Sequence, residues 1–196
     1  MKRTFDIIAS GLGLLCLSPL FLVVALWIKC DSKGPVFYRQ VRVGRDNKDF
    51  RLYKFRSMRP DSDKLGLITV GGHDPRVTRS GYFIRKWKLD EFPQLINVFV
   101  GDMSLVGPRP EVRKYVDMYT PEQMHVLDVR PGITSLASIR YRNENDILAA
   151  AEDPDKAYIE QVMPDKLAID MEYVGKASLW TDIKLIFSTF KEIIMK

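Results

Sequence analysis

The longest pattern along the chain is an apolar stretch at residues 7–28 that contains no charged side chain. As a straight helix it would measure roughly 33 Å, which is long enough to cross a bilayer. Ser18 and Pro19 lie near its middle, where a proline removes one helix hydrogen bond and bends the backbone. Basic residues flank both ends, including Lys2 and Lys29, so the positive-inside tendency draws both ends to the cytoplasm.

Two arrangements of this stretch are open: a simple transmembrane span, or a helix that enters the membrane, breaks and returns. The arm from residue 7 to Ser18 would reach only about 18 Å, short of a full crossing. The Ser18 hydroxyl can also bond the carbonyl that Pro19 leaves free. We therefore predict a re-entrant helix–break–helix over residues 1–30, with the break at Ser18–Pro19, followed by a domain over residues 31–196.

Beyond this stretch the pattern changes to short strands. Residues 36–38 and 50–55 flank the sequence GRDN at residues 44–47, which has the chemistry of a hairpin turn. Arginine and lysine alternate with aromatic residues along both strands. This arrangement suits an anion-binding surface or, alternatively, a solvated face lying against lipid headgroups.

The rest of the chain predicts mainly helices. Residues 59–77 are polar and glycine-rich and predict a loop, residues 110–127 predict a helical region, and residues 155–174 predict a helix interrupted by Pro164. Residues 179–194 form an amphipathic helix, which fits either a membrane interface or packing on the domain. The predicted fold class is α+β, mainly helical with a small β-hairpin, in a monotopic membrane protein with interfacial amphipathic helices.

Charge is distributed unevenly along the chain. Residues 1–60 carry twelve Lys or Arg against four Asp, a balance of +8, whereas the remaining 136 residues carry eighteen basic and twenty-one acidic side chains, a balance of −3. A basic amino-terminal third suggests an anionic partner: a membrane surface, a nucleic acid or a nucleotide. Cys16 and Cys30 show no metal-ligand spacing and give no reason to expect a disulfide, which fits the reducing cytosolic side.

The candidate chemistry lies at Asp90 and Glu91, which follow a basic, aromatic run. One interpretation makes Asp90 a helix N-cap, with Glu91 complementing the helix dipole. Another makes the pair catalytic, and both can hold at once. An aspartate is ionised at pH 7 and can attack phosphorus, a second carboxylate can hold Mg²⁺, and arginines offset phosphate charge.

Other catalytic classes have weaker signals. His73 lies in the predicted loop and could be a general base, although a lone loop histidine is more typically solvated, and His125 fits an ordinary helix residue. No cluster of His, Cys and Asp offers a zinc site. The chain has no P-loop and no GxGxxG motif, so a kinase, an NTPase or a dinucleotide enzyme is not indicated.

Four motifs stand out: YKFRSM at residues 53–58, LDEFPQL at 89–95, GDMSLVGPRP at 101–110 and RPGIT at 130–134. With Ser18–Pro19 and the carboxy-terminal WTDIK at residues 180–184, they make nearly the whole chain resemble the small monotopic phosphoglycosyl transferases. These are bacterial sugar transferases that load polyprenyl phosphate. The resemblance implies a re-entrant helix in the bacterial cytoplasmic membrane and a cytosol-facing site that uses a UDP-sugar and Mg²⁺.

The resemblance also implies residue roles. Asp90 would attack the β-phosphate of the UDP-sugar and release UMP, after which polyprenyl (undecaprenyl) phosphate would take the sugar-phosphoryl group and begin a glycoconjugate such as exopolysaccharide. Glu91 would be the Mg²⁺ ligand, and Lys54 would match a polar position of the catalytic site. Four further residues are candidates for substrate and phosphate binding: Arg85, Arg109, Asp170 and Arg142.

Several alternatives remain at the sequence level. Ser135 stands where the family often has Gly and Ser138 where it often has Gln, which bears on the nucleotide-sugar end. The donor is open between a UDP-N-acetylated hexosamine and UDP-glucose or UDP-galactose, and a homo-oligomer is also open. The alternative from another class is a membrane-tethered nucleic-acid-binding module with a dispensable Asp90. Because the basic hairpin does not resemble a groove-reading helix, we expect no nucleic-acid partner.

Overall fold

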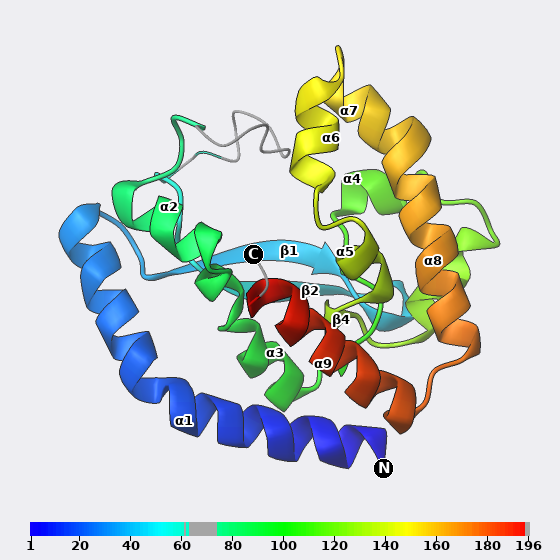
Figure 1. The fold of residues 1–196 in the computed structure, drawn as a ribbon, viewed down its shortest axis with the longest axis horizontal. Coiled ribbons are helices and arrows are strands. Elements are labelled where there is room, and N and C mark those ends of the chain that lie inside the picture. The colour runs from blue at the N-terminus through cyan, green and yellow to red at the C-terminus, as the bar shows by residue number, and fades with distance from the viewer. Residues whose placement is uncertain (61, 63–73, 195–196) are drawn as a thin grey trace.

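The computed structural model describes residues 1–60, 62 and 74–194. Figure 1 shows a long amino-terminal helix running along the edge of a mainly helical body that contains a two-stranded ribbon. The helices are α1 (Lys2–Asp31), α2 (Arg79–Lys86), α3 (Gln94–Val100), α4 (Arg113–Val116), α5 (Leu136–Arg140), α6 (Glu144–Ala150), α7 (Pro154–Ala157), α8 (Met163–Gly175) and α9 (Leu179–Ile194). The strands are β1 (Phe37–Val43), β2 (Asp49–Phe55), β3 (Ser104–Val106) and β4 (Gly132–Thr134). The predicted mainly helical fold with a small hairpin is confirmed.

Helix α1 is continuous, so the predicted break at Ser18–Pro19 takes a different form. Pro19 lies inside the helix, and Figure 1 shows α1 bending part-way along its length. Pro19 cannot bond the Leu15 carbonyl, which instead accepts a hydrogen bond from Ser18 Oγ at 2.8 Å, as predicted. Because the lost backbone bond is replaced locally, the helix bends without ending. By length and composition α1 could cross a membrane, and its re-entrant path stays a prediction.

One side of α1 packs on the body and the other is exposed. Val24 and Ile28 are buried together with Phe55 of β2 and Ile84 of α2. The following apolar side chains on the other side are more than half exposed: Ile8, Leu12, Leu15, Leu22, Val23 and Leu26. A contiguous apolar stripe of this length favours lipid as its surroundings.

Polar contacts join the start of α1 to the end of the chain. Lys2 Nζ donates to the Val106 carbonyl of β3 at 3.0 Å and forms an ion pair with Asp182 of α9. The Tyr173 hydroxyl of α8 donates to the other oxygen of Asp182 at 2.6 Å. Asp182 is 2% exposed, so these contacts satisfy a buried charge.

The other end of α1 is held by a second set of contacts. Asp31 accepts hydrogen bonds from the Ser80 amide at 2.9 Å and the Ser80 hydroxyl at 2.8 Å, at the start of α2. Arg56, which follows β2, donates to the Ser32 carbonyl at 2.8 Å. Gly34 has a φ of 126°, and a side chain there would collide with the Arg56 guanidinium, so this connection requires glycine. The end of α1, the start of α2 and the end of β2 therefore meet at one junction.

Strands β1 and β2 form the predicted antiparallel hairpin, with Phe37 opposite Phe55 and Val43 opposite Asp49. A second, parallel pair was not predicted: β3 lies beside β4, with Ser104 opposite Gly132. The two strands approach so closely that a Cβ atom at Gly132 would lie 2.1 Å from the Gly107 amide nitrogen. Three-residue strands are too short to show an alternating pattern, so the sequence carried no strand signal here.

The predicted helical region at residues 110–127 is mostly wrong. Helix is confined there to the short α4 and to a 3₁₀ segment, Gln123–Asp128. Thr120 and Gln123 form a local cap, with the Thr120 amide donating to Gln123 Oε1 at 2.9 Å. The conformation of the other residues in this region follows from tertiary packing, because Tyr115 and Val126 are both buried in one cluster around α8.

The carboxy-terminal helices follow their predicted positions. Residues 154–175 are helical throughout, and the Pro164 interruption appears as a π-helical segment, Tyr158–Val162, directly before α8. Helix α9 packs on β3, β4 and α5, with Leu185 and Asp182 buried. Trp180 and Phe187 of α9 are 66% and 71% exposed, so the helix combines packing on the domain with an exposed aromatic side.

Candidate active site

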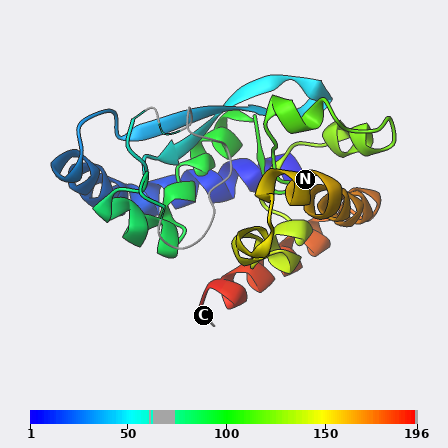
Figure 2. The same cartoon turned by 90° about the horizontal axis from the view of Figure 1, so that it is seen from above.

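A cleft of about 680 Å³ opens between two groups of elements: the β1–β2 ribbon with α2, and helices α4, α5, α6 and α8. Figures 1 and 2 show α2 on one side of the body and α4, α5, α6 and α8 on the other, with the β1–β2 ribbon running between them. Its described lining includes ten basic side chains (Arg42, Lys54, Arg56, Arg59, Arg76, Arg85, Lys88, Arg109, Arg142 and Lys166) and four acidic ones (Asp90, Glu91, Glu111 and Glu144). The excess of positive charge favours an anionic ligand.

Asp90 lies on a single 3₁₀ turn, Leu89–Glu91, between α2 and α3. Lys88 precedes this turn with a φ of 56°, a left-handed conformation that redirects the chain after α2. Helix α3 begins only at Gln94, so the interpretation of Asp90 as a helix N-cap is wrong, because further turn residues separate it from the helix. Asp90 is 8% exposed, and no described group bonds its Oδ1 atom. Burial raises the pKa of Asp90, and the charge of Lys54 opposes that rise.

Glu91 forms ion pairs with two cations, one that precedes it in the chain and one that follows it. Its Oε1 atom lies 3.0 Å from Lys54 Nζ and 2.5 Å from Arg109 Nη2. Burial alone would raise the pKa of Glu91, but Arg109 and Lys54 together hold it well below its usual range. Burial lowers the pKa of Lys54, and the charge of Glu91 opposes that change. The carboxylate is therefore kept ionised in a fixed orientation.

The position of the acidic turn relative to Lys54 depends on Asn97. This α3 side chain is completely buried; it accepts from the Tyr53 amide at 2.9 Å and donates to the Arg51 carbonyl at 2.8 Å. Both partners belong to β2, the strand that carries Lys54. Asn97 thus fixes α3, and the turn that precedes it, to the strand that supplies the first cation of Glu91.

The other predicted site residues divide into two groups. Arg85, Arg109 and Arg142 line the cleft together with the acidic pair, and the charge of Arg85 favours the ionised form of Asp90. Asp170 does not line this cleft; it is 4% exposed and lies beneath the start of α5, where its Oδ1 accepts from the Ala137 amide at 3.4 Å. Burial raises the pKa of Asp170 to about 6, an effect that the Ala137 and Arg109 amides oppose.

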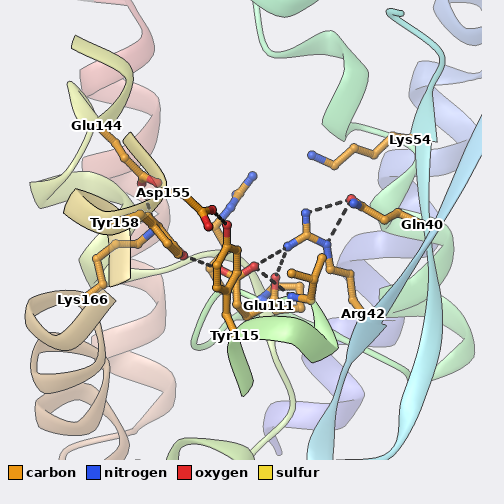
Figure 3. Close-up of polar contacts among 12 residues, drawn as sticks. Gln40, Arg42, Lys54, Glu111, Tyr115, Glu144, Asp155, Tyr158 and Lys166 are labelled. Atoms are coloured by element: carbon orange, nitrogen blue, oxygen red, sulfur yellow. Dashed lines mark hydrogen bonds and ion pairs between the residues drawn. The ribbon is translucent and has the colours of Figure 1, made fainter. Parts of the chain in front are cut away.

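Figure 3 shows a network that the sequence analysis missed, which we call the polar bridge: Gln40, Arg42, Glu111 and Tyr158. Arg42 Nη1 lies 2.9 Å from Glu111 Oε1, and Arg42 donates twice to Gln40 Oε1, at 2.8 Å and 3.1 Å. The Tyr158 hydroxyl donates to the other oxygen of Glu111. The bridge joins β1 to the segment before α8, and all four side chains line the cleft. The Arg42 side chain is 19% exposed, so the alternative that the basic residues of the hairpin form a solvated face does not hold for Arg42.

The described residues also bear on the histidines and on metal binding. His125 is exposed, lies 2.9 Å from Asp128 and is outside the cleft lining, and His73 lies outside the described residues. In the described part of the chain no group of three or more His, Cys, Asp or Glu could enclose a metal. A Mg²⁺ ion commonly needs only one or two carboxylates, since substrate phosphates supply further oxygens.

Comparison with known proteins identifies the family to which the chain belongs. The family described as bacterial sugar transferase matches the chain over residues 1–196. The chain belongs to this family. A sugar transferase from Aeromonas hydrophila, named UDP-N-acetylgalactosamine-undecaprenyl-phosphate N-acetylgalactosaminephosphotransferase, is 42% identical over 99% of this chain and 44% of its own length. The UDP-glucose:undecaprenyl-phosphate glucose-1-phosphate transferase of Klebsiella pneumoniae is 42% identical over 100% of this chain and 40% of its own length.

A third relative matches over most of both chains. The exopolysaccharide production protein PSS of Rhizobium leguminosarum bv. phaseoli is 41% identical over 96% of this chain and 92% of its own length. The chain therefore spans less than half the length of the first two relatives but nearly all of this one. The motifs at residues 53–58, 89–95, 101–110 and 130–134 all fall within the matched regions.

Proposed function

We propose that this chain transfers a sugar 1-phosphate from a UDP-sugar to polyprenyl phosphate and releases UMP, as the first step in assembling a glycoconjugate such as exopolysaccharide. The observation that carries the proposal is Asp90, a buried carboxylate whose Oδ1 has no partner among the described residues and which faces a strongly basic cleft. Such a carboxylate can act as a nucleophile toward an anionic substrate held by the surrounding cations. The names of the relatives, which include UDP-sugars and undecaprenyl phosphate, support the same class of reaction.

The reaction proceeds in two displacements at one phosphorus atom. The Asp90 carboxylate attacks the β-phosphorus of the UDP-sugar, the bond from that phosphorus to the bridging oxygen breaks, and UMP leaves with the bridging oxygen. A phosphate oxygen of the polyprenyl phosphate then attacks the sugar-phosphoryl aspartate, which frees the Asp90 carboxylate and forms the polyprenyl diphosphate sugar. Arg85 and Lys88 line the cleft beside Asp90, where they offset charge on the phosphate oxygens.

Mg²⁺ fits the oxygen donors of this site. Among the described residues Asp90 Oδ1 has no partner, and Glu91 Oε2 makes only a longer contact there, 3.4 Å from Arg109 Nη1. Glu91 would hold the ion, in line with the preference of Mg²⁺ for one or two carboxylates plus substrate phosphates. The bound ion would neutralise charge on the diphosphate. Lys54 and Arg109 keep Glu91 ionised for this role.

We place the chain in the cytoplasmic membrane of a bacterium, with the cleft facing the cytosol. The exposed apolar side of α1 and the bend at Pro19 support a helix that enters and leaves through the same face. The exposed Trp180 and Phe187 of α9 fit a position at the membrane interface. This arrangement brings the cleft to the depth of a lipid phosphate.

Release of UMP tests the proposal. Detergent-purified protein is incubated with a panel of UDP-sugars and Mg²⁺, with and without polyprenyl phosphate, and Asp90→Asn is compared with the exposed control Asp128→Asn. We expect wild type and Asp128→Asn to release UMP, and Asp90→Asn to be inactive while still associating with membranes. Labelled sugar phosphate retained on the protein without lipid would identify the covalent step. Substantial turnover by Asp90→Asn would eliminate Asp90 as the nucleophile.

A membrane-tethered nucleic-acid-binding module is the second candidate, and the basic amino-terminal third is the observation that favours it. It predicts binding to DNA or RNA that weakens steeply with salt and is unaffected by Asp90→Asn. The same preparations can be titrated with labelled oligonucleotides. UMP release without such binding would remove this candidate.

A further inference from the structure

The cleft is chemically divided on either side of Asp90 and Glu91. On the side of α2, every charged residue in the described lining is basic: Arg56, Arg59, Arg76, Arg85 and Lys88. On the side of α4 to α8, the lining also holds carboxylates, an amide and phenol rings, at Glu111, Glu144, Asn145, Tyr115 and Tyr158. Arg142 and Lys166 line this side as well, and Lys166 is paired with Glu144, as Arg42 is with Glu111. Carboxylates repel phosphates but accept hydrogen bonds from hydroxyl groups. The second side therefore suits an uncharged group that is rich in hydroxyls.

The polar bridge reaches from β1 to this second side, where it presents fixed donors and acceptors. Gln40 Oε1 accepts two hydrogen bonds from Arg42, which fixes the amide, and its Nε2 donates to no described residue. Glu111 Oε1 accepts from Arg42 and from the Val112 amide, whereas Glu111 Oε2 accepts from the Tyr158 hydroxyl and retains further acceptor capacity. Tyr158 is 5% exposed and its ring packs against that of Tyr115, with centroids 4.8 Å apart. These groups are held in place before any ligand arrives.

We infer that the polar bridge binds the sugar of the UDP-sugar donor, an inference that rests on the proposed function. The β-phosphate must lie at Asp90 for the attack, and the sugar is bonded directly to that phosphate. The bridge lies next in the cleft, because Glu111 follows Arg109 by two residues and Arg109 is bound to Glu91. A fixed amide, a carboxylate and adjacent phenol rings match the hydroxyls and the apolar face of a pyranose ring.

Uridine is the other uncharged part of the donor, and the charge distribution places it elsewhere. Uridine is separated from the β-phosphate by the α-phosphate, which carries negative charge of its own. The all-basic lining on the α2 side is the complementary surface for that second phosphate. With the α-phosphate on that side, the sugar points toward the bridge.

Binding measurements that separate the sugar from the nucleotide test the inference. All proteins carry Asp90→Asn, so that the donor is not consumed, and each is titrated calorimetrically with UMP and with the UDP-sugar that the wild type uses. Tyr158→Phe removes one hydroxyl and keeps the packed ring, and Glu111→Gln removes the charge and keeps the shape. Tyr82→Phe is the matched control, since it loses a hydrogen-bonded hydroxyl, 2.8 Å from the Asp74 carbonyl, outside the cleft lining.

We expect both bridge variants to weaken UDP-sugar binding about ten-fold, equivalent to about 1.4 kcal/mol, with UMP affinity within about two-fold of the parent. The control should change neither affinity. Equal weakening of UMP and UDP-sugar would assign the bridge to uridine or to the general shape of the cleft, and would overturn the inference. Unchanged binding of both ligands would leave the bridge a purely structural contact and would also overturn it.

Failure of the underlying function gives a different result. In that case the wild-type protein releases no UMP from any donor, and the Asp90→Asn parent binds neither ligand. If the wild type releases UMP but the bridge variants retain full donor affinity, only the sugar assignment falls. Thermal unfolding of each variant shows whether a loss of binding reflects a loss of the fold.

Discussion

Replacing Lys54 with methionine removes a positive charge beside both carboxylates while keeping most of the length of the side chain. Lys54 Nζ and Glu91 Oε1 are 3.0 Å apart, which at an effective dielectric constant of 20 corresponds to an attraction of about 5.5 kcal/mol before desolvation is subtracted. Arg109 continues to hold Glu91 in the variant. We therefore expect a net loss of about 2 kcal/mol in the free energy of unfolding, less than for a buried ion pair broken completely.

The same change should alter the pH dependence of catalysis. Among the charges that oppose the effect of burial on Asp90, Lys54 is the strongest, so its removal raises the pKa of Asp90 further. A nucleophile with a higher pKa is protonated at a higher pH, and the acidic limb of kcat/KM moves upward. A shift of about one pH unit corresponds to about 1.4 kcal/mol of lost stabilisation of the carboxylate.

The assay is UMP release as a function of pH, together with denaturant unfolding of the same preparations. Lys54→Arg keeps the charge and should retain the acidic limb near its wild-type position. Lys86→Met is the matched control, because Lys86 lies at the end of α2, outside the cleft lining, with its Nζ 5.9 Å from the Trp87 ring centroid. An acidic limb in Lys54→Met that coincides with wild type would refute the role of Lys54 in keeping Asp90 ionised.

Three other changes have defined outcomes. Asn97→Leu leaves the Tyr53 amide and the Arg51 carbonyl without their partner, so denaturant unfolding should show a free energy of unfolding lower by about 2–4 kcal/mol. A variant as stable as wild type would contradict the role of Asn97 in joining α3 to β2. Burial raises the pKa of Asp170 from 3.8 to about 6, so the folded protein binds this proton more tightly than the unfolded chain does. The resulting stabilisation is full below pH 3.8 and is lost as the pH rises through 6. The difference in unfolding free energy between pH 5 and pH 7.5 should therefore be smaller in Asp170→Asn than in wild type, and an unaltered difference would count against this. Pro19→Ala restores the amide that bonds the Leu15 carbonyl and should straighten α1. Thiol labelling of Cys16 and Cys30 from each side of a vesicle should then show a changed membrane topology.

Elements governed by neighbouring residues were predictable from the sequence. The β1–β2 hairpin follows from its turn residues, α9 from its apolar periodicity, and the Ser18 bond from the carbonyl that Pro19 leaves free. Residues 110–127 were not predictable, because the local helix signal at Thr120 competes with the need to bury Tyr115 against Tyr158, more than forty residues later. Parallel pairing of β3 and β4 is likewise a contact between distant segments.

The candidate site shows the same division. Asp90 and Glu91 are adjacent in the chain, and Arg109 lies in a recognisable motif, so the sequence pointed to both. The sequence carried no signal that Tyr158 would meet Glu111, since 47 residues separate them. Glu111 itself offered a clue, because it directly follows the motif that contains Arg109. Asp170, placed at the site by resemblance, lies beneath α5, because its carboxylate accepts hydrogen bonds from backbone amides.

The contact between Lys2 and Asp182 has a consequence for biosynthesis. The two residues are 180 positions apart, and a ribosome adds roughly 5 to 20 residues per second, so Lys2 emerges about 10 to 40 s before its partner. During that interval the apolar helix is already available to the membrane, while the charged group at its start has no buried acceptor. In the membrane placement proposed above, insertion of α1 would precede the docking of its first turn, and the rest of the chain would close onto a helix that lipid already surrounds.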